Sequence, residues 1–332
     1  MSGLNPVSLL NIGSDSPTIE HILDTLETCR RPRITRNDDR KWFDWLLIRR
    51  KGIELGFVNR SYFEATPEDE WGRGHSLIFQ VYLYTSNFND NPEILAYTGQ
   101  LPHGLKFTDS RAQAQKKLSN YIRYESQQTD CWHTENYRLH IRYTPSRNSI
   151  ESLALSLPLH PFPEEGRIPC NISCQDWINL FGADIDSEVI NRAVAPLDIR
   201  QRMLDSDDER EADFTFESGF EMYFEESIKT RRTNNQNKQG LVLAAAKFFR
   251  ARERDARQWA GELPYGLSFS DGPLKALEKI KTPPAIREES RLTGYFLWHF
   301  ATHSLHILYS TFDNQLMRVT LMTPNYWTTL EK

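Results

Sequence analysis

The segment LPHGLKFTD at residues 101–109 returns almost unchanged as LPYGLSFSD at residues 263–271. Each copy contains a proline, which fixes the backbone angle φ, and a glycine, which adopts backbone conformations that other residues resist. The repeated phrase therefore predicts a shaped turn, and it predicts the same turn at two places in one chain.

Each turn is expected to lead into a helix. Serine, threonine and aspartate are favoured N-cap residues, and pairs of them follow both turns: Thr108 and Asp109, then Ser270 and Asp271. We therefore expect helices at about 110–118 and 272–281, with Pro273 well placed in the first turn of the second.

The repetition extends beyond the phrase. Downstream, CWHTENYRLHIRY at 131–143 matches LWHFATHSLHILY at 297–309, with Trp-His and Leu-His-Ile at equal spacing. Upstream, KGIELGF at 51–57 matches SGFEMYF at 218–224, and the order of the segments is preserved. A repeat this long indicates a duplicated domain, since solenoid repeats run about 20–50 residues.

The chain divides at a proline-rich stretch. LHPFPEEGRIPCN at 159–171 has three prolines and no periodicity, which is typical of a linker. The length suits two domains, so we expect a first repeat domain at 1–158, the linker at 159–171 and a second repeat domain at 172–332.

Each domain is expected to be an α+β unit, with an antiparallel sheet covered by helices. In the strand at 137–144, alternation places Leu139, Ile141 and Tyr143 on the face that packs on the helix, with His140 and Arg142 on the other. The expected helices at the start of the two copies are 16–27 and 186–194. The expected strands are 52–57, 76–85, 130–134, 137–144 and 150–157 in the first copy, and 219–225, 240–249, 295–300, 304–310 and 316–322 in the second.

Composition limits the function classes. The formal net charge is −5, and 39% of residues are hydrophobic. A basic surface is needed to coat nucleic acid, so we expect no nucleic-acid partner. We expect no membrane partner either, because no apolar stretch is long enough to span a bilayer. The N-terminus does not resemble a signal peptide, so a cytoplasmic location is expected, and the four cysteines are interpreted as structural or incidental thiols.

The order of the motifs resembles two groups of proteins. The helix-plus-meander pattern looks like the tandem units of beta-lactamase inhibitor protein. LPHGLKFTDSR at 101–111, followed by a tryptophan and the strand LHIRY, resembles immunity proteins encoded beside bacterial antagonism toxins of the type VI secretion or Rhs polymorphic kinds. The second copy departs by having Gly272-Pro273 where the first has Ser110-Arg111. The resemblance implies a protein that occludes its own toxin, and it transfers no set of functional residues.

No catalytic signature is present. The sequence lacks a nucleophile elbow, an H-E-x-x-H motif, a P-loop and a dinucleotide fingerprint. We therefore expect no catalytic residues, no cofactor and no metal. The repeated histidines are interpreted as sheet-face residues inherited through duplication, and a metal or recognition role is the alternative; they are His133, His140, His299, His303 and His306.

Charge and aromatic residues provide the candidates for a binding surface. The run RRPRITRNDDRK at 30–41 is basic, whereas the equivalent run DSDDEREAD at 205–213 is acidic and would suit a basic partner. A solvated loop is the alternative for both runs, and packing inside its own domain is the alternative for Trp71. The toxin-interface candidates are Asp205, Asp207, Asp208, Glu209, Trp71, His140, Arg142 and His306.

The sequence thus predicts a cytoplasmic immunity protein that binds and sterically neutralises a cognate toxin, through a groove between the domains or an exposed sheet face. Two alternatives stay open: a metal-dependent or hydrolytic enzyme that uses the strand histidines, and a non-catalytic scaffold module.

Overall fold

The structure is a computed structural model that describes residues 4–34, 42–86, 88, 91–170, 172–204, 210–226, 240–324 and 326. It separates into two compact units. The first comprises residues 1–160 together with 312–314, and the second comprises 161–311 and 315–332. The division falls within the stretch that was expected to be a linker. Part of that stretch is held by the second unit, where Arg257 donates to the carbonyl oxygens of Glu165 and Phe216 at 2.9 and 2.7 Å.

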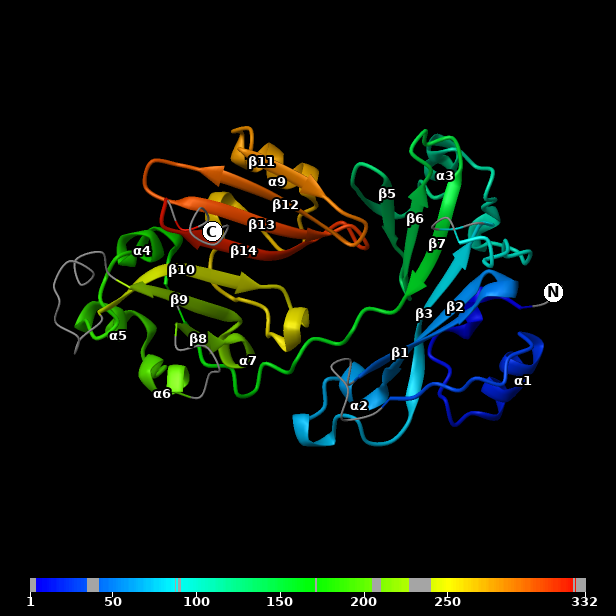
Figure 1. The fold of residues 1–332 in the computed structure, drawn as a ribbon, viewed down its shortest axis with the longest axis horizontal. Helices are drawn as coiled ribbons and strands as arrows, with labels where there is room; N and C mark the ends of the chain where they lie inside the picture. The colour runs from blue at the N-terminus through cyan, green and yellow to red at the C-terminus, as the bar shows by residue number, and fades with distance from the viewer. Residues whose placement is uncertain are drawn as a thin grey trace. The chain divides into compact units, whose positions relative to one another are not determined.

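The first unit contains a seven-stranded antiparallel sheet in the order β1-β2-β3-β7-β6-β5-β4 (Figure 1). Its strands are β1 (Phe43–Ile48), β2 (Ile53–Asn59), β3 (Ser76–Tyr84), β4 (Ile122–Glu125), β5 (Thr129–His133), β6 (Arg138–Tyr143) and β7 (Ile150–Ser156). Its helices are α1 (Pro17–Thr25), α2 (Arg60–Phe63) and α3 (Arg111–Lys117), with short 3-10 turns at Pro6–Leu9, Arg49–Lys51, Glu68–Glu70 and Pro102–Gly104.

The second unit repeats this sheet strand for strand, in the order β8-β9-β10-β14-β13-β12-β11. Its strands are β8 (Glu211–Phe214), β9 (Phe220–Glu226), β10 (Leu241–Phe249), β11 (Ile286–Glu289), β12 (Thr293–His299), β13 (Ser304–Ser310) and β14 (Leu316–Met322). Its helices are α4 (Cys174–Leu180), α5 (Glu188–Val194), α6 (Ile199–Leu204), α7 (Thr215–Ser218) and α9 (Pro273–Ile280), with 3-10 turns at Glu253–Asp255 and Pro264–Gly266. The expected α+β duplication is therefore confirmed.

One face of each sheet is covered by helices and forms the core. In the first unit Leu139, Ile141 and Tyr143 are fully buried and pack with residues of α1 and α3, as the alternation predicts. The second core is built in the same way, with Trp298 and Tyr309 at its centre. We call the opposite face of each sheet its outer face. Among the described residues, no helix is long and apolar enough to cross a membrane.

The repeated phrase forms the same fastened turn in both units. His103 and Gly104 have positive φ angles of 54° and 66°, and a lysine of the following helix secures them. Lys117 Nζ donates to Gly104 O at 2.8 Å and to Asp109 Oδ2 at 2.7 Å. In the second unit Lys279 makes the equivalent bonds to Gly266 O and Asp271 Oδ2, at 2.7 and 2.6 Å.

The aspartates of the phrase are therefore not helix caps, and the N-cap prediction was wrong. The capping residue lies one position later, at Ser110 for α3 and at Gly272 for α9. Asp109 was misassigned because a carboxylate just before a helix can do either of two things. It can cap the helix, or it can accept a hydrogen bond from a lysine two turns into that helix, as Asp109 does from Lys117.

The left-handed residue of each turn also contacts the hairpin between two meander strands, and the contact pair is reversed between the copies. His103 Nε2 lies 2.7 Å from the Tyr137 hydroxyl, whereas the Tyr265 hydroxyl lies 3.4 Å from His303 Nε2. The same imidazole–phenol contact is thus built with its two partners exchanged. This exchange indicates that the two copies preserve the contact itself rather than either residue.

The departure of the second copy from the motif has a structural counterpart. Arg111 Nη2 is paired with the fully buried Asp130 at 2.6 Å, and Asp130 also accepts from the Tyr143 hydroxyl. In the second unit Pro273 stands at the position of Arg111, and the buried Phe296 stands at that of Asp130. The ion pair is therefore replaced as a unit by apolar packing, which leaves the helix start intact.

Candidate functional site

A line of polar side chains crosses the outer face of the second sheet. Cross-strand pairing places Asp213 beside Glu221, Glu221 beside Lys247, Lys247 beside Thr320, and Thr320 beside His306. We call these five residues, which come from five adjacent strands, the polar row. Alternation explains their common face, because Ala212, Phe214, Phe220 and Met222 point the other way into the core.

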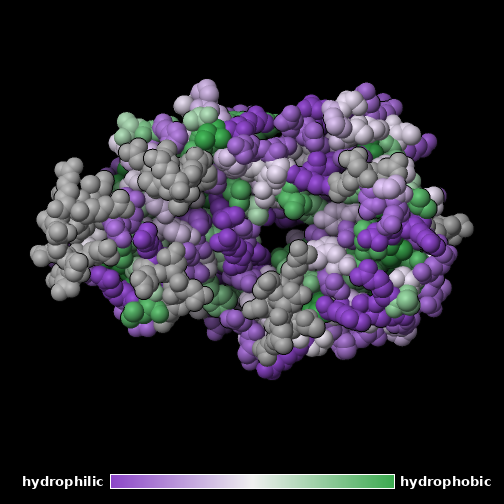
Figure 2. Space-filling model, in the orientation of Figure 1, coloured by the Kyte–Doolittle hydropathy of each residue, from purple (hydrophilic) through white to green (hydrophobic). Residues whose placement is uncertain are grey.

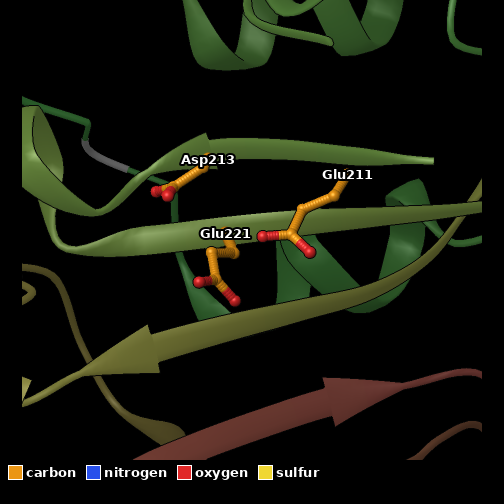
Figure 3. Close-up of side chains that lie close together, drawn as sticks. All are labelled: Glu211, Asp213 and Glu221. Carbon is orange, nitrogen blue, oxygen red and sulfur yellow. The ribbon is translucent and has the colours of Figure 1, made fainter. Parts of the chain in front are cut away.

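The acidic end of the polar row is joined by Glu211. Glu211 and Asp213 project from β8 and Glu221 from the neighbouring β9, with their carboxyl groups on the same face (Figure 3). One oxygen from each of the three carboxylates lies within 4.8 Å of one from each of the others. Glu221 is only 3% exposed, whereas Glu211 and Asp213 are half-buried. Three negative charges therefore gather at one edge of the sheet.

Lys247 and Tyr223 stabilise this cluster. Lys247 Nζ donates to Glu221 Oε2 at 2.8 Å and to the Tyr223 hydroxyl oxygen at 2.5 Å, while that hydroxyl donates to Glu221 Oε2 at 2.6 Å. The ammonium group also lies 4.3 Å from the centre of the Tyr223 ring, a favourable cation–π contact. Burial, opposed by the attraction of Glu221, lowers the pKa of Lys247.

The charges of the cluster also shift the pKa values of its members. Burial, followed by repulsion from Glu221, raises the pKa of Glu211. Burial and the nearby Glu221 charge likewise raise the pKa of Tyr223, so its hydroxyl keeps its proton. Lys247 donates to Glu221, and the Arg318 guanidinium also attracts Glu221. Glu211 and Asp213 lie on the edge strand β8, where a positively charged group from outside could approach them.

Three convergent carboxylates also resemble the oxygen ligands that hold Ca²⁺ or Mg²⁺. The residues present do not fit such an ion well, because the Lys247 ammonium already occupies the cation position on Glu221. A metal ion bound to all three carboxylates would have to lie beside that positive charge. The cluster is better described as an ion-paired network than as an empty metal site.

The equivalent row of the first sheet is largely apolar. Its members are Leu47, Glu54, Tyr82, Ala154 and His140, in the same strand order. Only the glutamate and the histidine are common to both rows. The outer faces of the two sheets have therefore diverged, one toward charge and the other toward aromatic and aliphatic side chains.

The structure places the predicted interface residues in different environments. Trp71 is buried, with its indole N–H donating to Thr66 O at 2.8 Å, and it packs on Trp42 and Tyr62. This placement favours the alternative that Trp71 packs within its own domain. His140 is also buried, so its surface role is disfavoured in the same way.

The other candidates divide into three groups. Arg142 belongs to the first unit, where it is half-buried and donates to Gln128 Oε1 at 3.2 Å. His306 alone joins the row. The four acidic candidates lie outside the described residues; they are Asp205, Asp207, Asp208 and Glu209.

Sequence reasoning missed the residues that form the cluster. Glu211 and Asp213 belong to the acidic run at 205–213, but they form strand β8 and not a loop. The alternation of polar and apolar residues in Glu-Ala-Asp-Phe at 211–214 was the available signal. Nothing in the sequence links them to Lys247, because the contact depends on strand pairing across the sheet.

The two equivalent histidines predict a pH dependence. Burial lowers the pKa of His140 to about 3 and that of His306 to about 4. An unfolded histidine has a pKa near 6.5. Below that pH the imidazole is therefore protonated in the unfolded chain, while it stays neutral in the folded chain until the pH approaches its lowered pKa. The stability due to each histidine is complete above about pH 6.5 and falls by about 1.4 kcal/mol per pH unit as the pH drops toward its folded pKa.

Urea unfolding of the second unit at pH 7, 6 and 5 tests this expectation. Replacing His306 by glutamine should flatten the decline in stability relative to the parent chain. An equal slope in the His306 variant and the parent would contradict the assignment.

Comparisons with known proteins add no relative: no family model, no curated protein and no solved structure matches the chain.

Proposed function

We propose that this chain is a cytoplasmic immunity-type protein that binds a cognate protein toxin and blocks it sterically. The observation that supports the proposal is the carboxylate cluster of Glu211, Asp213 and Glu221 on the outer face of the second sheet. Two of its members are half-buried at the edge strand β8, where a partner side chain has access. The Lys247 ammonium that pairs with the cluster donates to Glu221 on β9, whereas Glu211 and Asp213 lie on β8.

Such an edge is suited to a basic partner. Complementary charge raises the rate at which two proteins meet and penalises partners of the wrong sign. A toxin that acts on nucleic acid carries a positive track for the phosphates of its substrate, and carboxylates can imitate those phosphates. In this mechanism the protein contributes shape and charge, and no bond of the toxin is made or broken.

The visible surface is compatible with this mode of binding. Figure 2 shows hydrophilic residues over much of the coloured surface on this face, with hydrophobic residues in smaller patches between them. An interface on such a surface relies on charge and polar contacts around a limited apolar centre.

Co-expression with the product of the neighbouring gene, which the proposal expects to be the toxin, tests the proposal. The parent chain should restore growth and co-purify with the toxin. The double variant Glu211→Lys/Asp213→Lys should lose most of this protection, whereas Glu188→Lys, on the exposed side of α5, should retain it. Killing that the parent chain does not relieve would remove the hypothesis.

A further inference from the structure

The four edge strands of the two sheets differ in what they offer to another strand. Along an antiparallel ladder, alternate residues direct their N–H and C=O groups to the partner strand and away from it. The bond from Asn59 N to Trp42 O, at 2.9 Å, sets this alternation for β1. The residues of β1 whose backbone groups face the free edge are therefore Phe43, Trp45 and Leu47.

A side-chain contact supports this assignment. Trp45 N donates to Asp44 Oδ1 at 2.9 Å, so its N–H is directed away from β2. Among the described residues, Phe43 and Leu47 make no backbone hydrogen bond with a second strand on that side. Within the described part of the chain, the outer edge of β1 thus presents three consecutive alternate positions.

The other three edges carry charge at the corresponding positions. The pairing of Ser126 with Thr129 sets the ladder of β4, that of Ser290 with Thr293 sets β11, and that of Arg210 with Phe224 sets β8. The positions that face their free edges are Arg123 and Glu125 in β4, Arg287 and Glu289 in β11, and Glu211 and Asp213 in β8. Charged side chains at an edge oppose the addition of another strand.

The edge of β1 is apolar instead. The side chains of Phe43, Trp45 and Leu47 are half-buried on the outer face. Trp45 packs over Gly56 of β2 and against Phe79, with ring centres 6.2 Å apart in the latter pair. An edge strand with apolar side chains and free backbone groups is a template for pairing.

We propose that β1 pairs with β1 of a second copy of this chain, in antiparallel register about a two-fold axis at Trp45. The three free positions are symmetric about Trp45, so Phe43 faces Leu47 of the second copy, and each Trp45 faces its equivalent. All three positions then exchange both backbone hydrogen bonds, and apolar side chains meet apolar side chains. Pairing with β4, β8 or β11 would instead place charges beside these aromatic rings.

Asp44 controls how strongly the edges associate. Its carboxylate accepts from Trp45 N and, at 2.6 Å, from Arg33 N. The first bond must exchange for a bond to the second copy, so it competes with pairing. Because of this competition we expect weak association, with dimers forming only at high protein concentration. Loss of the Asp44 carboxylate removes the competing bond and is expected to strengthen association. This inference is independent of toxin binding.

Sedimentation of the full chain over a concentration series tests the proposal. The parent should shift reversibly from monomer to dimer. Leu47→Lys should raise the dissociation constant at least about tenfold, and Asp44→Ala should lower it about threefold or more. The matched control is Ile122→Lys, because Ile122 is 67% exposed on the charge-bearing edge strand β4, and this variant should behave as the parent.

Hydrogen exchange provides a readout that needs no variant. The amides of Phe43, Trp45 and Leu47 should exchange more slowly at high than at low protein concentration, while those of Arg123 and Glu125 should not change. A parent chain and an Asp44→Ala variant that both stay monomeric, with concentration-independent exchange at β1, would overturn the proposal. A dimer that persists in Leu47→Lys would overturn it as well.

Discussion

Replacing Lys247 by methionine is expected to lower the free energy of unfolding of the second unit by about 3 kcal/mol at neutral pH. Methionine preserves most of the side-chain volume but removes the ammonium that donates to Glu221 Oε2. Glu221 is 3% exposed, so its charge would stay buried beside those of Glu211 and Asp213. Removing one partner of a buried ion pair typically costs about 3–5 kcal/mol.

Two controls separate the loss of the ion pair from the loss of packing. The double variant Glu221→Gln/Lys247→Met should recover much of the stability, because no unpaired buried charge remains. Lys275→Met removes an exposed ion pair with Glu278, in which the side chains are 57% and 66% exposed, and should change stability by less than about 0.5 kcal/mol.

The cost of Lys247→Met should also depend on pH. Acid protonates the carboxylates that the lysine opposes, beginning with Glu211, whose pKa burial already raises. The difference in unfolding free energy between the variant and the parent should therefore shrink as the pH falls from 7 toward 4. Urea unfolding at several pH values measures it, and a pH-independent difference would show that packing rather than charge is responsible.

Recognition of the duplication from sequence was possible because it depends on local patterns. The phrase at 101–109 combines residues with restricted or unusual backbone preferences, and the strand LHIRY alternates cleanly. Both features are set by neighbouring residues along the chain, so they survive in a single sequence. The strands β4 and β11 escaped prediction because each is only four residues long, too short for a periodic pattern to stand out.

The candidate site was less accessible from sequence because it is built from long-range pairs. Glu221 and Lys247 are 26 residues apart, and only the pairing of β9 with β10 brings them together. The reversed contacts of His103 with Tyr137 and of Tyr265 with His303 were hidden for the same reason. Trp71 lies among acidic residues in the sequence but is surrounded by aromatic rings in space.

A glycine outside the candidate site provides the most sensitive test of the duplicated architecture. Gly219 precedes β9 with φ +80°, and Phe249 N donates to its carbonyl oxygen at 3.0 Å. A Cβ atom at this position would lie 2.5 Å from both Arg257 O and Trp259 N. Gly52 occupies the same place in the first unit, where a Cβ atom would lie 2.3 Å from Leu95 O.

Gly219→Ala is therefore expected to destabilise the second unit by about 4 kcal/mol or more, from backbone strain together with a clash against main-chain atoms. Those atoms cannot retreat easily, because Trp259 N donates to Phe249 O at 2.9 Å. Hydrogen exchange should show lost protection in the second unit while the first keeps its own.

Gly266→Ala is the matched comparison for this substitution. Gly266 also has a positive φ, of +66°, but no atom lies within 4 Å of the position that an added Cβ would take, so only the conformational penalty of about 1–2 kcal/mol applies. The difference between the two alanine variants therefore measures the close approach of the 257–259 segment to Gly219. Equal costs for the two would mean that this segment does not pack against β9 as described, and the correspondence between Gly52 and Gly219 would lose its structural basis.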